Sequence, residues 1–274
     1  HGEAGYIHDQ RSLQYGNRYH GMKPVNGQIL KESDGQPGWA LDIYSKHSGN
    51  YYPTHGLGPV AKYMDINRGD NFDFLVSIDS MQANYHRYGR EMFTDWRKDY
   101  KVKMGDMNIS IIRTKLGRTI LVQHDVGNFR PYSRLNLISG TRGIVADYPF
   151  RAVVEDRTQK PGTPVHRFDD KVSEEIREKY KHPLWRQAGD LAQKIGGHGG
   201  MDFLMMLRIA YCLQNGLPLD MNVYDLATWC SLGELTERSA DRRGASMDVP
   251  DFTRGAWETV KPLGDLTVEL AELV

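Results

Sequence analysis

The sequence predicts an α+β fold, with a mostly antiparallel or mixed sheet and helices packed on one face. Two observations support this prediction. The first part of the chain alternates apolar and polar residues, as strands do, whereas after about residue 168 apolar residues recur at three- and four-residue spacing, as in helices. Strands that precede helices, rather than alternate with them, favour a sheet whose helices gather on one side. Hydrophobic residues form 39% of the 274 residues, enough to build such a core.

The predicted strands lie in the first part of the chain. Residues 1–10 are expected to form a short strand, and residues 11–50, rich in Gly, Tyr, Asn and Lys, a long functional loop region. Further strands are predicted where β-favouring residues alternate, with a hairpin turn at residues 115–118: 72–81, 108–114, 119–126, 137–139 and 143–147.

Helices are predicted for residues 54–64, with Thr54 as the N-cap, and for most of the chain after residue 168. Pro161 and Pro164 flank a polar linker that leads into this second region. The apolar spacing there predicts four helices: 169–180, 183–195, 201–215 and 223–238.

The composition excludes several classes of protein. Lys+Arg and Asp+Glu each total 35, so no excess charge favours binding to nucleic acid or to an anionic membrane. No apolar run approaches the roughly 18 residues that a membrane span needs. Cys212 and Cys230 lie in apolar helical patterns and are expected to be buried thiols, and no Cys/His spacing indicates a metal site.

A glycine pattern at residues 56–61 matches the G-x-G-x-x-A fingerprint of dinucleotide-binding proteins. That fingerprint follows a buried apolar strand, whereas here it follows a polar segment that ends in Tyr-Pro-Thr-His. Pro59 also removes an N–H group where a phosphate would need one. We therefore reject a phosphate-binding role for this string.

The segment Tyr52-Pro53-Thr54-His55-Gly56 is a candidate site. Pro53 restricts the backbone at the start of the predicted helix, which puts His55 in its first turn. A helix N-terminus disfavours a protonated imidazole, so a neutral histidine that accepts a proton is expected. The alternative is a structural histidine beside a packed tyrosine.

A second candidate group lies at the end of the first strand, where Glu3, Tyr6, His8 and Asp9 occur. Residues two apart on a strand share a face, so Tyr6 and His8 are expected on one side. The alternative is a solvated strand edge.

Two further segments suit ligand contacts. His198 is flanked by two glycines on each side, as in a lid or a simple interhelical loop, and the turn 130–134 presents Tyr132 between two arginines. The hydroxyl and guanidinium groups of this turn suit recognition of hydroxyl or acetamido groups.

Together these segments resemble glycoside hydrolase family 109, which comprises NAD-dependent α-N-acetylgalactosaminidases of the Gfo/Idh/MocA oxidoreductase architecture. The resemblance rests on five strings that occur in order along most of the chain: residues 2–9, 52–59, 65–70, 196–202 and 248–257. It implies that residues 1–274 form the substrate-binding, catalytic C-terminal domain. The family's NAD-binding Rossmann domain is then expected to precede His1, and the chain alone is expected to be inactive.

The resemblance also implies roles for individual residues. His55, Tyr52 and Tyr6 match the catalytic group, and His8 and Tyr52 lie on the cofactor side. Contacts to a carbohydrate substrate are implied for a larger set: Tyr6, Tyr52, Pro53, Thr54, His55 and Tyr132. The resemblance implies no metal ion. It implies a homodimer that forms through the sheet. It also implies a periplasmic location if the family's usual signal sequence precedes the chain.

One position departs from the family pattern. Where relatives have Trp-Arg before the Tyr-Pro-Thr-His string, this chain has Trp39-Ala40, so a guanidinium that contacts substrate in the family is missing.

The reaction that the resemblance implies is redox-neutral. The sugar is oxidised at C3 by NAD, its C2 proton and C1 substituent are eliminated, water adds and the hydride returns. Two alternatives remain open. One is a sugar dehydrogenase of the same superfamily, and the other is a non-catalytic fragment that mediates oligomerisation.

Overall fold

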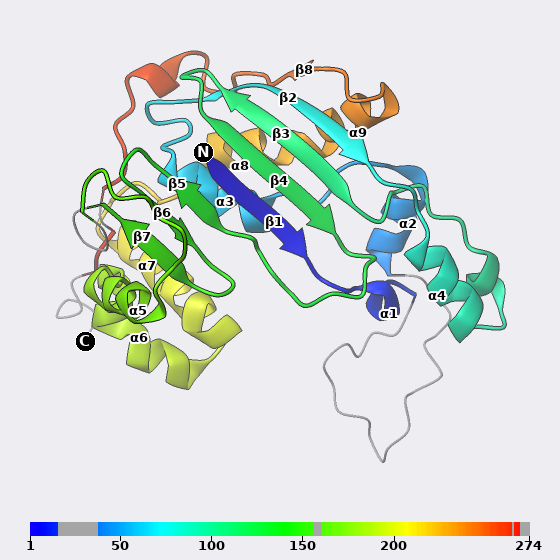
Figure 1. Ribbon diagram of the computed structural model, residues 1–274, viewed down its shortest axis with the longest axis horizontal. Helices are drawn as coiled ribbons and strands as arrows, with labels where there is room; N and C mark the ends of the chain where they lie inside the picture. Colours follow the sequence, from blue (N-terminus) through cyan, green and yellow to red (C-terminus); the bar gives the residue numbers. More distant parts are fainter. Residues whose placement is uncertain (16–37, 156–159, 265, 269–274) are drawn as a thin grey trace.

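The computed structural model describes residues 1–15, 38–155, 160–264 and 266–268. Within them, the strands form one eight-stranded sheet in the order β7-β6-β5-β1-β4-β3-β2-β8 (Figure 1). The strands are β1 (Gly2–Ile7), β2 (Phe72–Asp79), β3 (Asn108–Thr114), β4 (Thr119–Asp125), β5 (Leu137–Ser139), β6 (Gly143–Ala146), β7 (Arg151–Val154) and β8 (Met247–Asp248).

The sheet is mixed, as predicted, because one pair of neighbours differs from the rest. β1 runs parallel to β4, with Tyr6 beside His124, and antiparallel to β5. All other neighbouring strands are antiparallel, including the β3–β4 hairpin. β1, the amino-terminal strand, therefore lies in the middle of the sheet, between β5 and β4.

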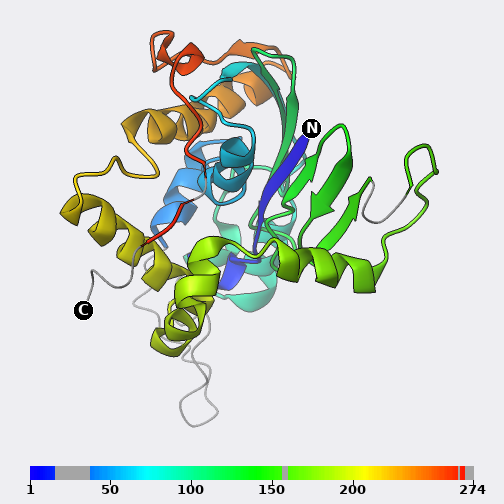
Figure 2. The same cartoon turned by 90° about the vertical axis from the view of Figure 1, so that its left-hand side faces the viewer.

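The helices are α1 (Arg11–Gln14), α2 (Trp39–Lys46), α3 (Thr54–Tyr63), α4 (Asn84–Met92), α5 (Asp170–Lys179), α6 (Pro183–Ile195), α7 (Met201–Gln214), α8 (Val223–Cys230) and α9 (Leu232–Asp241). Short 3-10 turns occupy Trp96–Asp99, His198–Gly200 and Ala256–Glu258. α3, α8 and α9 lie on one side of β1 (Figure 2). α5 packs on β7, and α6 pairs with α7.

The main core lies between these helices and the central strands. Its residues alternate along each strand and form stripes on each helix: Ala4, Leu57, Val60, Ala61, Met64, Ile66, Phe72, Leu75, Ile112, Ile120, Val122, Trp229, Leu232, Leu235 and Val249. Burying each large apolar side chain stabilises the fold by roughly 1.5–3 kcal/mol. The prediction that helices cover one face of the sheet is confirmed.

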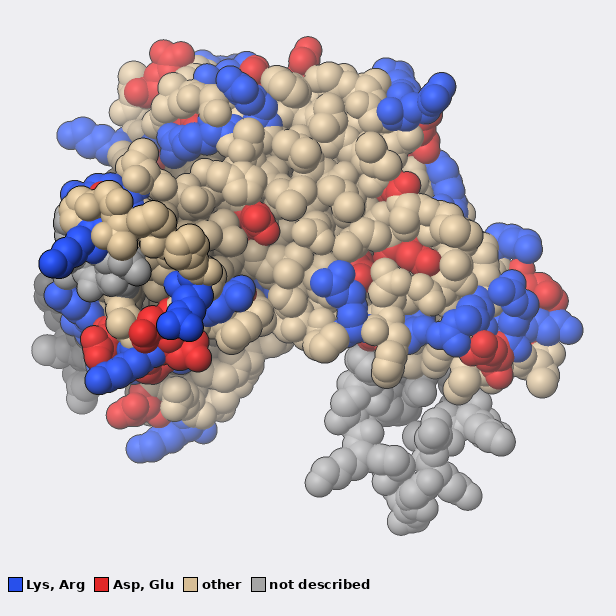
Figure 3. Space-filling model, viewed as in Figure 1, with Lys and Arg blue, Asp and Glu red and all other residues tan. Residues whose placement is uncertain are grey.

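The opposite face of the central strands is open. Ile78, Ile109 and Ile111 are 63%, 45% and 47% exposed there. A broad area without charged side chains covers this part of the molecule (Figure 3). The strict alternation of buried and exposed residues along β3 shows why its sequence reads as a strand with two different faces.

A buried ion pair joins two segments that lie far apart in the sequence. Arg68, in the turn after α3, donates two hydrogen bonds to Asp225 of α8 at 2.7 and 2.8 Å. Lys62 donates to the same carboxylate at 3.2 Å, and this pairing lowers the pKa of Asp225 even though burial opposes it. The pair fixes α8 against α3.

Four expectations from the sequence are wrong in part. The region 11–50 contains α1 and α2 rather than only loop, and residues 16–37 lie outside the described residues. Thr54 is not the cap of α3, because Pro53 takes that position without a side-chain hydrogen bond. The helix predicted at 223–238 is two helices that meet at Ser231, whose hydroxyl donates to the Thr228 carbonyl.

The fourth concerns the cysteines, since Cys212 is buried but Cys230, at the end of α8, is exposed. Three elements had no clear pattern in the sequence: α4, β7 and β8. α4 is polar on average and buries only Tyr85 and Gly89, so its sequence offers few apolar residues from which a helix could be predicted.

Two glycines bring α3 close to β1 and to α8. A Cβ atom on Gly56 would lie 2.4 Å from both N and O of Gly5 in β1, far inside van der Waals contact. A Cβ atom on Gly58, one half-turn later, would lie 3.3 Å from the ring of Trp229 in α8. The helix can therefore approach β1 this closely only because position 56 carries no side chain.

We expect Gly56→Ala to lower the free energy of unfolding by roughly 1–3 kcal/mol, because the added methyl must push α3 off β1. Gly233→Ala in α9 is the matched control. A Cβ there makes an ordinary 3.6 Å contact with Tyr51, so this variant should be neutral or slightly more stable. Chemical denaturation of both variants tests the contact, and equal stability of Gly56→Ala and the parent would contradict it.

Candidate active site

Tyrosine and histidine rings from three parts of the chain meet at the carboxyl end of β1. Tyr6 comes from β1, while Tyr52 and His55 come from the start of α3. The ring centroids of Tyr6 lie 4.6 Å from Tyr52 and 4.9 Å from His55, and Tyr52 and His55 are 4.6 Å apart. His8 and Tyr132 lie 5.2 Å from each other at its rim. We call these five residues the aromatic cluster.

The segment before α3 is held by α9, which fixes Tyr52. The backbone N–H of Asn50 donates to Oγ1 of Thr236 at 2.8 Å, and Oδ1 of Asn50 accepts from the N–H of Tyr52 at 3.0 Å. The Tyr51 hydroxyl donates to Glu237 at 2.5 Å. Burial raises the pKa of Glu237, but hydrogen bonds from Tyr51, His47 and Lys103 outweigh it and lower that pKa to about 2. Glu237 is therefore ionised at neutral pH and holds the segment that carries Tyr52 through these hydrogen bonds.

Tyr6 is the centre of a hydrogen-bond network within the cluster. Its hydroxyl lies 3.0 Å from Nδ1 of His8 and accepts a hydrogen bond from Nε2 of Gln10 at 2.9 Å. Burial, followed by the neighbouring Tyr52 and Tyr132, raises the pKa of Tyr6 to about 12. Tyr6 therefore keeps its proton at neutral pH and is a hydrogen-bond donor.

His55 is held in its neutral form. Burial lowers its pKa below the ordinary 6.5, and the nearby Arg134, followed by His198 and His8, lowers it further. This direction agrees with the neutral histidine that the sequence predicted from the helix N-terminus, with burial as the first cause. A neutral imidazole at pH 7 accepts a proton without first losing one.

Arg134 brings a cation to the cluster. Its Nε donates to the Tyr132 hydroxyl at 2.7 Å, and its charge acts on both Tyr6 and His55. The sequence identified the turn that carries it, but no pattern indicated that Arg134 rather than Arg130 faces the cluster. Arg130 instead pairs with the buried Asp125 at 3.3 Å.

Not all residues of the predicted strand-end group join the cluster. Oε1 of Glu3 lies 3.7 Å from Nε2 of His1. Because Glu3 is three positions before Tyr6 on β1, its side chain is on the other face of the strand. Asp9 accepts hydrogen bonds from Arg11 at 2.9 and 2.8 Å. Tyr6 and His8 share a side, as predicted. Gln10 was not singled out in the sequence because a lone glutamine in a polar stretch carries no signal.

Three other predicted positions lie at or behind the cluster. Pro53 and Thr54 occupy the first turn of α3, between Tyr52 and His55. Ala40, on α2, is only 2% exposed and belongs to a buried group that includes Tyr6 and Tyr44, with Tyr52 packed against it. Position 40 is therefore adjacent to the cluster, and its methyl group fills core space.

The G-x-G-x-x-A string lies inside α3, where Gly56 and Gly58 face Gly5 and Trp229. Its rejection as a phosphate-binding turn is therefore confirmed, since those glycines have no open face. Within the described residues, the string offers no cradle for the pyrophosphate of a dinucleotide.

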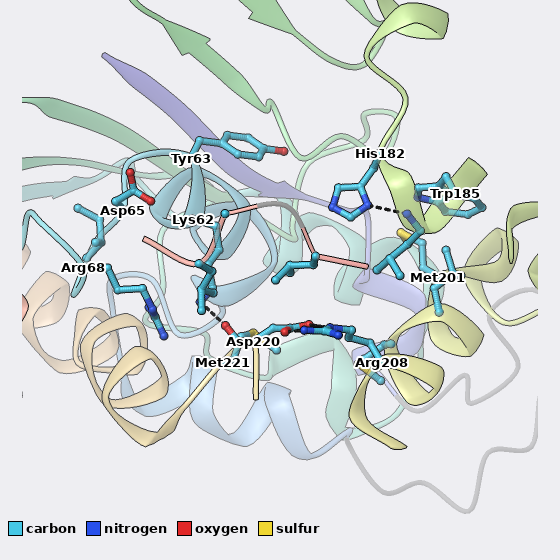
Figure 4. A pocket seen from close by; sticks show the side chains of 17 residues that line it. Lys62, Tyr63, Asp65, Arg68, His182, Trp185, Met201, Arg208, Asp220 and Met221 are labelled. Carbon is cyan, nitrogen blue, oxygen red and sulfur yellow. Dashed lines mark hydrogen bonds and ion pairs between the residues drawn. The ribbon is translucent and has the colours of Figure 1, made fainter. Parts of the chain in front are cut away.

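A cavity of about 620 Å³ lies at the other end of α3, next to Lys62 and Tyr63 (Figure 4). α6, α7 and the segment around Leu263 complete its walls. Its charged residues are engaged with one another: Lys62 donates to the Asp220 carbonyl at 2.6 Å, and Arg208 to the Asp220 carboxylate at 3.1 Å. Asp65, Arg68 and His182 also line the cavity, among mostly apolar side chains.

The described residues contain neither a metal-binding group of side chains nor a membrane-spanning helix. No group of three or more His, Cys, Asp or Glu side chains in that part of the chain is arranged to hold a metal ion. None of its helices combines the length and the apolar character needed to cross a membrane.

The fold is shared with a known oxidoreductase. The apo form of levoglucosan dehydrogenase superposes with a TM-score of 0.52 at 14% identity, over 92% of this chain and 59% of that one. The fold that the sequence predicted, a mixed sheet with helices on one face, is thus shared with this dehydrogenase.

Sequence relatives identify the family. A glycosyl hydrolase family 109 protein of Shewanella woodyi is 46% identical over 271 residues, and an alpha-N-acetylgalactosaminidase of Shewanella oneidensis is 46% identical over 266 residues. Each alignment covers 96% of this chain and 54% of the relative, so the chain spans about half the length of these relatives. The model of the glycosyl hydrolase 109 C-terminal domain matches residues 1–259, and the chain therefore belongs to glycosyl hydrolase family 109.

Proposed function

We propose that this chain forms the catalytic, sugar-binding part of an NAD-dependent glycosidase that acts on α-N-acetylgalactosaminides or related α-glycosides. The observation that carries the proposal is the aromatic cluster, in which a neutral His55 lies against Tyr6 and Tyr52 with Arg134 beside them. The relative from Shewanella oneidensis that bears the name alpha-N-acetylgalactosaminidase supports the sugar class.

The chemistry of the cluster favours elimination over displacement. Most glycosidases use two opposed carboxyl groups. Asp9, just after β1, and Asp125, beside Ile7 at the end of β4, pair with Arg11 and Arg130. The described residues thus bring tyrosine, histidine and arginine, but no carboxylate pair, to the cluster. These groups suit proton transfer next to a carbonyl, which is what an oxidised sugar requires.

Each residue of the cluster has a proposed role. Bound NAD would accept the hydride of sugar C3 and return it at the end. Neutral His55 takes the proton from the C3 hydroxyl or from C2, and the protonated Tyr6 donates a hydrogen bond to the oxygen that becomes negative. Arg134 stabilises that charge, and Tyr52 and Tyr132 pack against the sugar ring, with His8 at the nicotinamide side.

The phosphates of NAD need another binding surface. Gly56 and Gly58 are packed inside the fold, so we propose that the pyrophosphate is bound by a Rossmann domain outside these residues. On this proposal the 274 residues alone have no glycosidase activity.

A sugar dehydrogenase is the second candidate, since the fold is shared with levoglucosan dehydrogenase. The two functions differ in the product: a dehydrogenase releases an oxidised sugar and leaves reduced cofactor, whereas the proposed glycosidase returns the hydride. A purely structural role would leave the geometry of Tyr6, Tyr52 and His55 without a purpose.

We also propose that the open face of the sheet pairs two copies of the chain. Ile78, Ile109 and Ile111 present apolar surface there, and the neighbouring residues form the uncharged area of Figure 3. An isologous contact between two such faces would bury this surface.

Hydrolysis in deuterated water tests the reaction. If the C2 proton leaves and returns from solvent, the released sugar carries deuterium at C2, as measured by mass spectrometry or NMR. His55→Ala in the full-length protein should lower kcat by about 10²–10⁴. His166→Ala, a change of an exposed loop histidine, is the control and should have full activity. A sugar without deuterium at C2 would exclude the elimination route.

The pKa of His55 sets the acid side of the pH profile. The neutral form is the active base and is lost when pH falls through the pKa, which lies below 6.5. We therefore expect kcat/KM to hold constant from pH 8 to 6.5 and to fall only at lower pH. A fall that begins above pH 7 would assign the base to another group.

We expect Arg134→Ala to weaken binding of an α-N-acetylgalactosaminide by about tenfold or more, because a charge-assisted hydrogen bond contributes roughly 1.5–3 kcal/mol. Arg130→Ala, on the same turn, is the control. Ala40→Arg, which restores the family's residue, should lower the melting temperature because Ala40 is buried. Unchanged KM and Kd in Arg134→Ala would remove the arginine from the site.

The pairing of sheets is tested by Ile111→Glu, which puts a charge in the middle of the open face. We expect sedimentation velocity to show a dimer for the parent and a monomer for the variant. Leu116→Glu changes a residue of the β3–β4 turn that is more exposed than Ile111 (61% against 47%) but lies off the face, so this variant should remain a dimer. Dimers of Ile111→Glu with undiminished affinity would place the interface elsewhere.

A further inference from the structure

Exposed tyrosine rings continue from the aromatic cluster toward the far end of α3. The ring centroid of Tyr132, at the rim of the cluster, lies 6.2 Å from that of Tyr6 and 6.0 Å from that of Tyr148. Tyr132 and Tyr148 are 41% and 40% exposed, and Tyr63, the last residue of α3, is 57% exposed. Tyr148 and Tyr63 have no part in the reaction proposed above.

The turn between β6 and β7 holds Tyr148 in place. Its backbone has a φ of 70°, a left-handed conformation that bulky residues adopt seldom. The backbone N–H of Asp147 donates to the Asn136 carbonyl at 2.7 Å, and the Asp147 carboxylate accepts a hydrogen bond from the N–H of Tyr148 at 2.6 Å. These bonds tie the turn to the start of β5 and keep the ring of Tyr148 beside that of Tyr132.

Tyr63 lies close to this turn. α3 packs against β5, whose neighbour β6 leads into the turn that carries Tyr148. Burial, followed by the nearby Asp147 and Tyr148, raises the pKa of Tyr63, although more than half of this residue's surface is exposed. Three tyrosines therefore lead from the cluster to the end of α3, and we call Tyr132, Tyr148 and Tyr63 the tyrosine row.

The tyrosine row ends at the cavity of about 620 Å³, because Tyr63 is part of its lining. Figure 4 shows Tyr63 on one side of this cavity and His182 and Trp185 on the other. Proteins bind small molecules in cavities of roughly 300–1,000 Å³. The row and the cavity thus form one continuous surface that starts at the aromatic cluster and has room for a ligand.

The charged side chains at the cavity favour a neutral ligand. Lys62 and Arg68 share the carboxylate of Asp225, and Arg208 pairs with Asp220. These cations are therefore already engaged within the protein, and an anion would have to compete with their carboxylate partners.

Several polar groups along this surface are open to a ligand. Within the described residues, no hydrogen bond engages the hydroxyls of Tyr63 and Tyr148, the indole N–H of Trp185 or the carboxylate of Asp65. An aromatic ring packs against C–H groups, while hydroxyl, indole and carboxylate groups bind hydroxyls. A sugar presents both kinds of group, so this combination suits a neutral carbohydrate.

On the basis of the proposed function, we propose that the tyrosine row and the cavity bind the sugars attached to the C1 oxygen of the reacting α-N-acetylgalactosamine. The aromatic cluster holds the sugar that reacts, and its C1 oxygen carries the rest of the substrate. The second sugar packs on Tyr148, and the third reaches Tyr63 and Trp185. The substrate that this surface selects is therefore a neutral oligosaccharide rather than a simple glycoside.

The test compares two substrates of the full-length protein with NAD. Methyl α-N-acetylgalactosaminide has only a methyl group on its C1 oxygen, whereas a neutral trisaccharide with terminal α-N-acetylgalactosamine carries two further sugars. Tyr148→Asn and Tyr63→Ala are the variants, because asparagine tolerates a left-handed backbone and alanine suits a helix.

We expect each variant to lower kcat/KM for the trisaccharide by about tenfold, mainly through KM, because a ring contact and a hydrogen bond are lost. For the methyl glycoside the loss should be at least about fivefold smaller, since that substrate does not reach the row beyond Tyr132. Tyr224→Ala, which removes an exposed ring of α8 outside the cavity lining, is the control and should change neither value.

The outcomes separate this proposal from the proposed function. Equal effects of Tyr148→Asn and Tyr63→Ala on the two substrates, with deuterium still entering C2 in the parent, would overturn the role of the tyrosine row and leave the elimination route intact. Absence of deuterium at C2 in the parent protein would instead overturn the proposed function itself.

Discussion

The contact between Gly5 of β1 and Gly56 of α3 is the constraint on which the candidate site depends. Because no side chain separates the two backbones, the first turn of α3 lies directly on the end of β1. Tyr6 is the next residue along the strand, and His55 the residue before Gly56 in the helix. Their rings thus meet at 4.9 Å, although 48 residues separate them in the chain.

Burial sets the protonation states of the site. The same loss of solvent raises the pKa of Tyr6 to about 12 and lowers that of His55, because in each case it disfavours the charged form. The result is a donor beside an acceptor at neutral pH. The charge of Arg134 acts on both residues: it lowers the pKa of His55 further, and it lowers the pKa of Tyr6 against the effect of burial.

The helical part of the chain completes this arrangement from outside the sheet. The Arg68–Asp225 pair fixes α8 against α3, and the Glu237 network fixes the segment that carries Tyr52. α6 and α7 share a cavity wall with the far end of α3. Groups from both halves of the chain therefore act on one helix, α3.

The sequence by itself determined the type of fold and the core of the site. Alternation marked β2, β3 and β4, and the Tyr-Pro-Thr-His string marked the start of α3, because strand and helix periodicity and proline geometry are local properties. Only the tertiary structure decided that Arg134 and Gln10 join Tyr6 while Glu3 faces away, that Ala40 is buried, and that Cys230 is exposed. The tertiary structure alone also showed the helix α4 and the break between α8 and α9 at Ser231. These features depend on contacts between side chains that are distant in the sequence, and local sequence patterns do not contain that information.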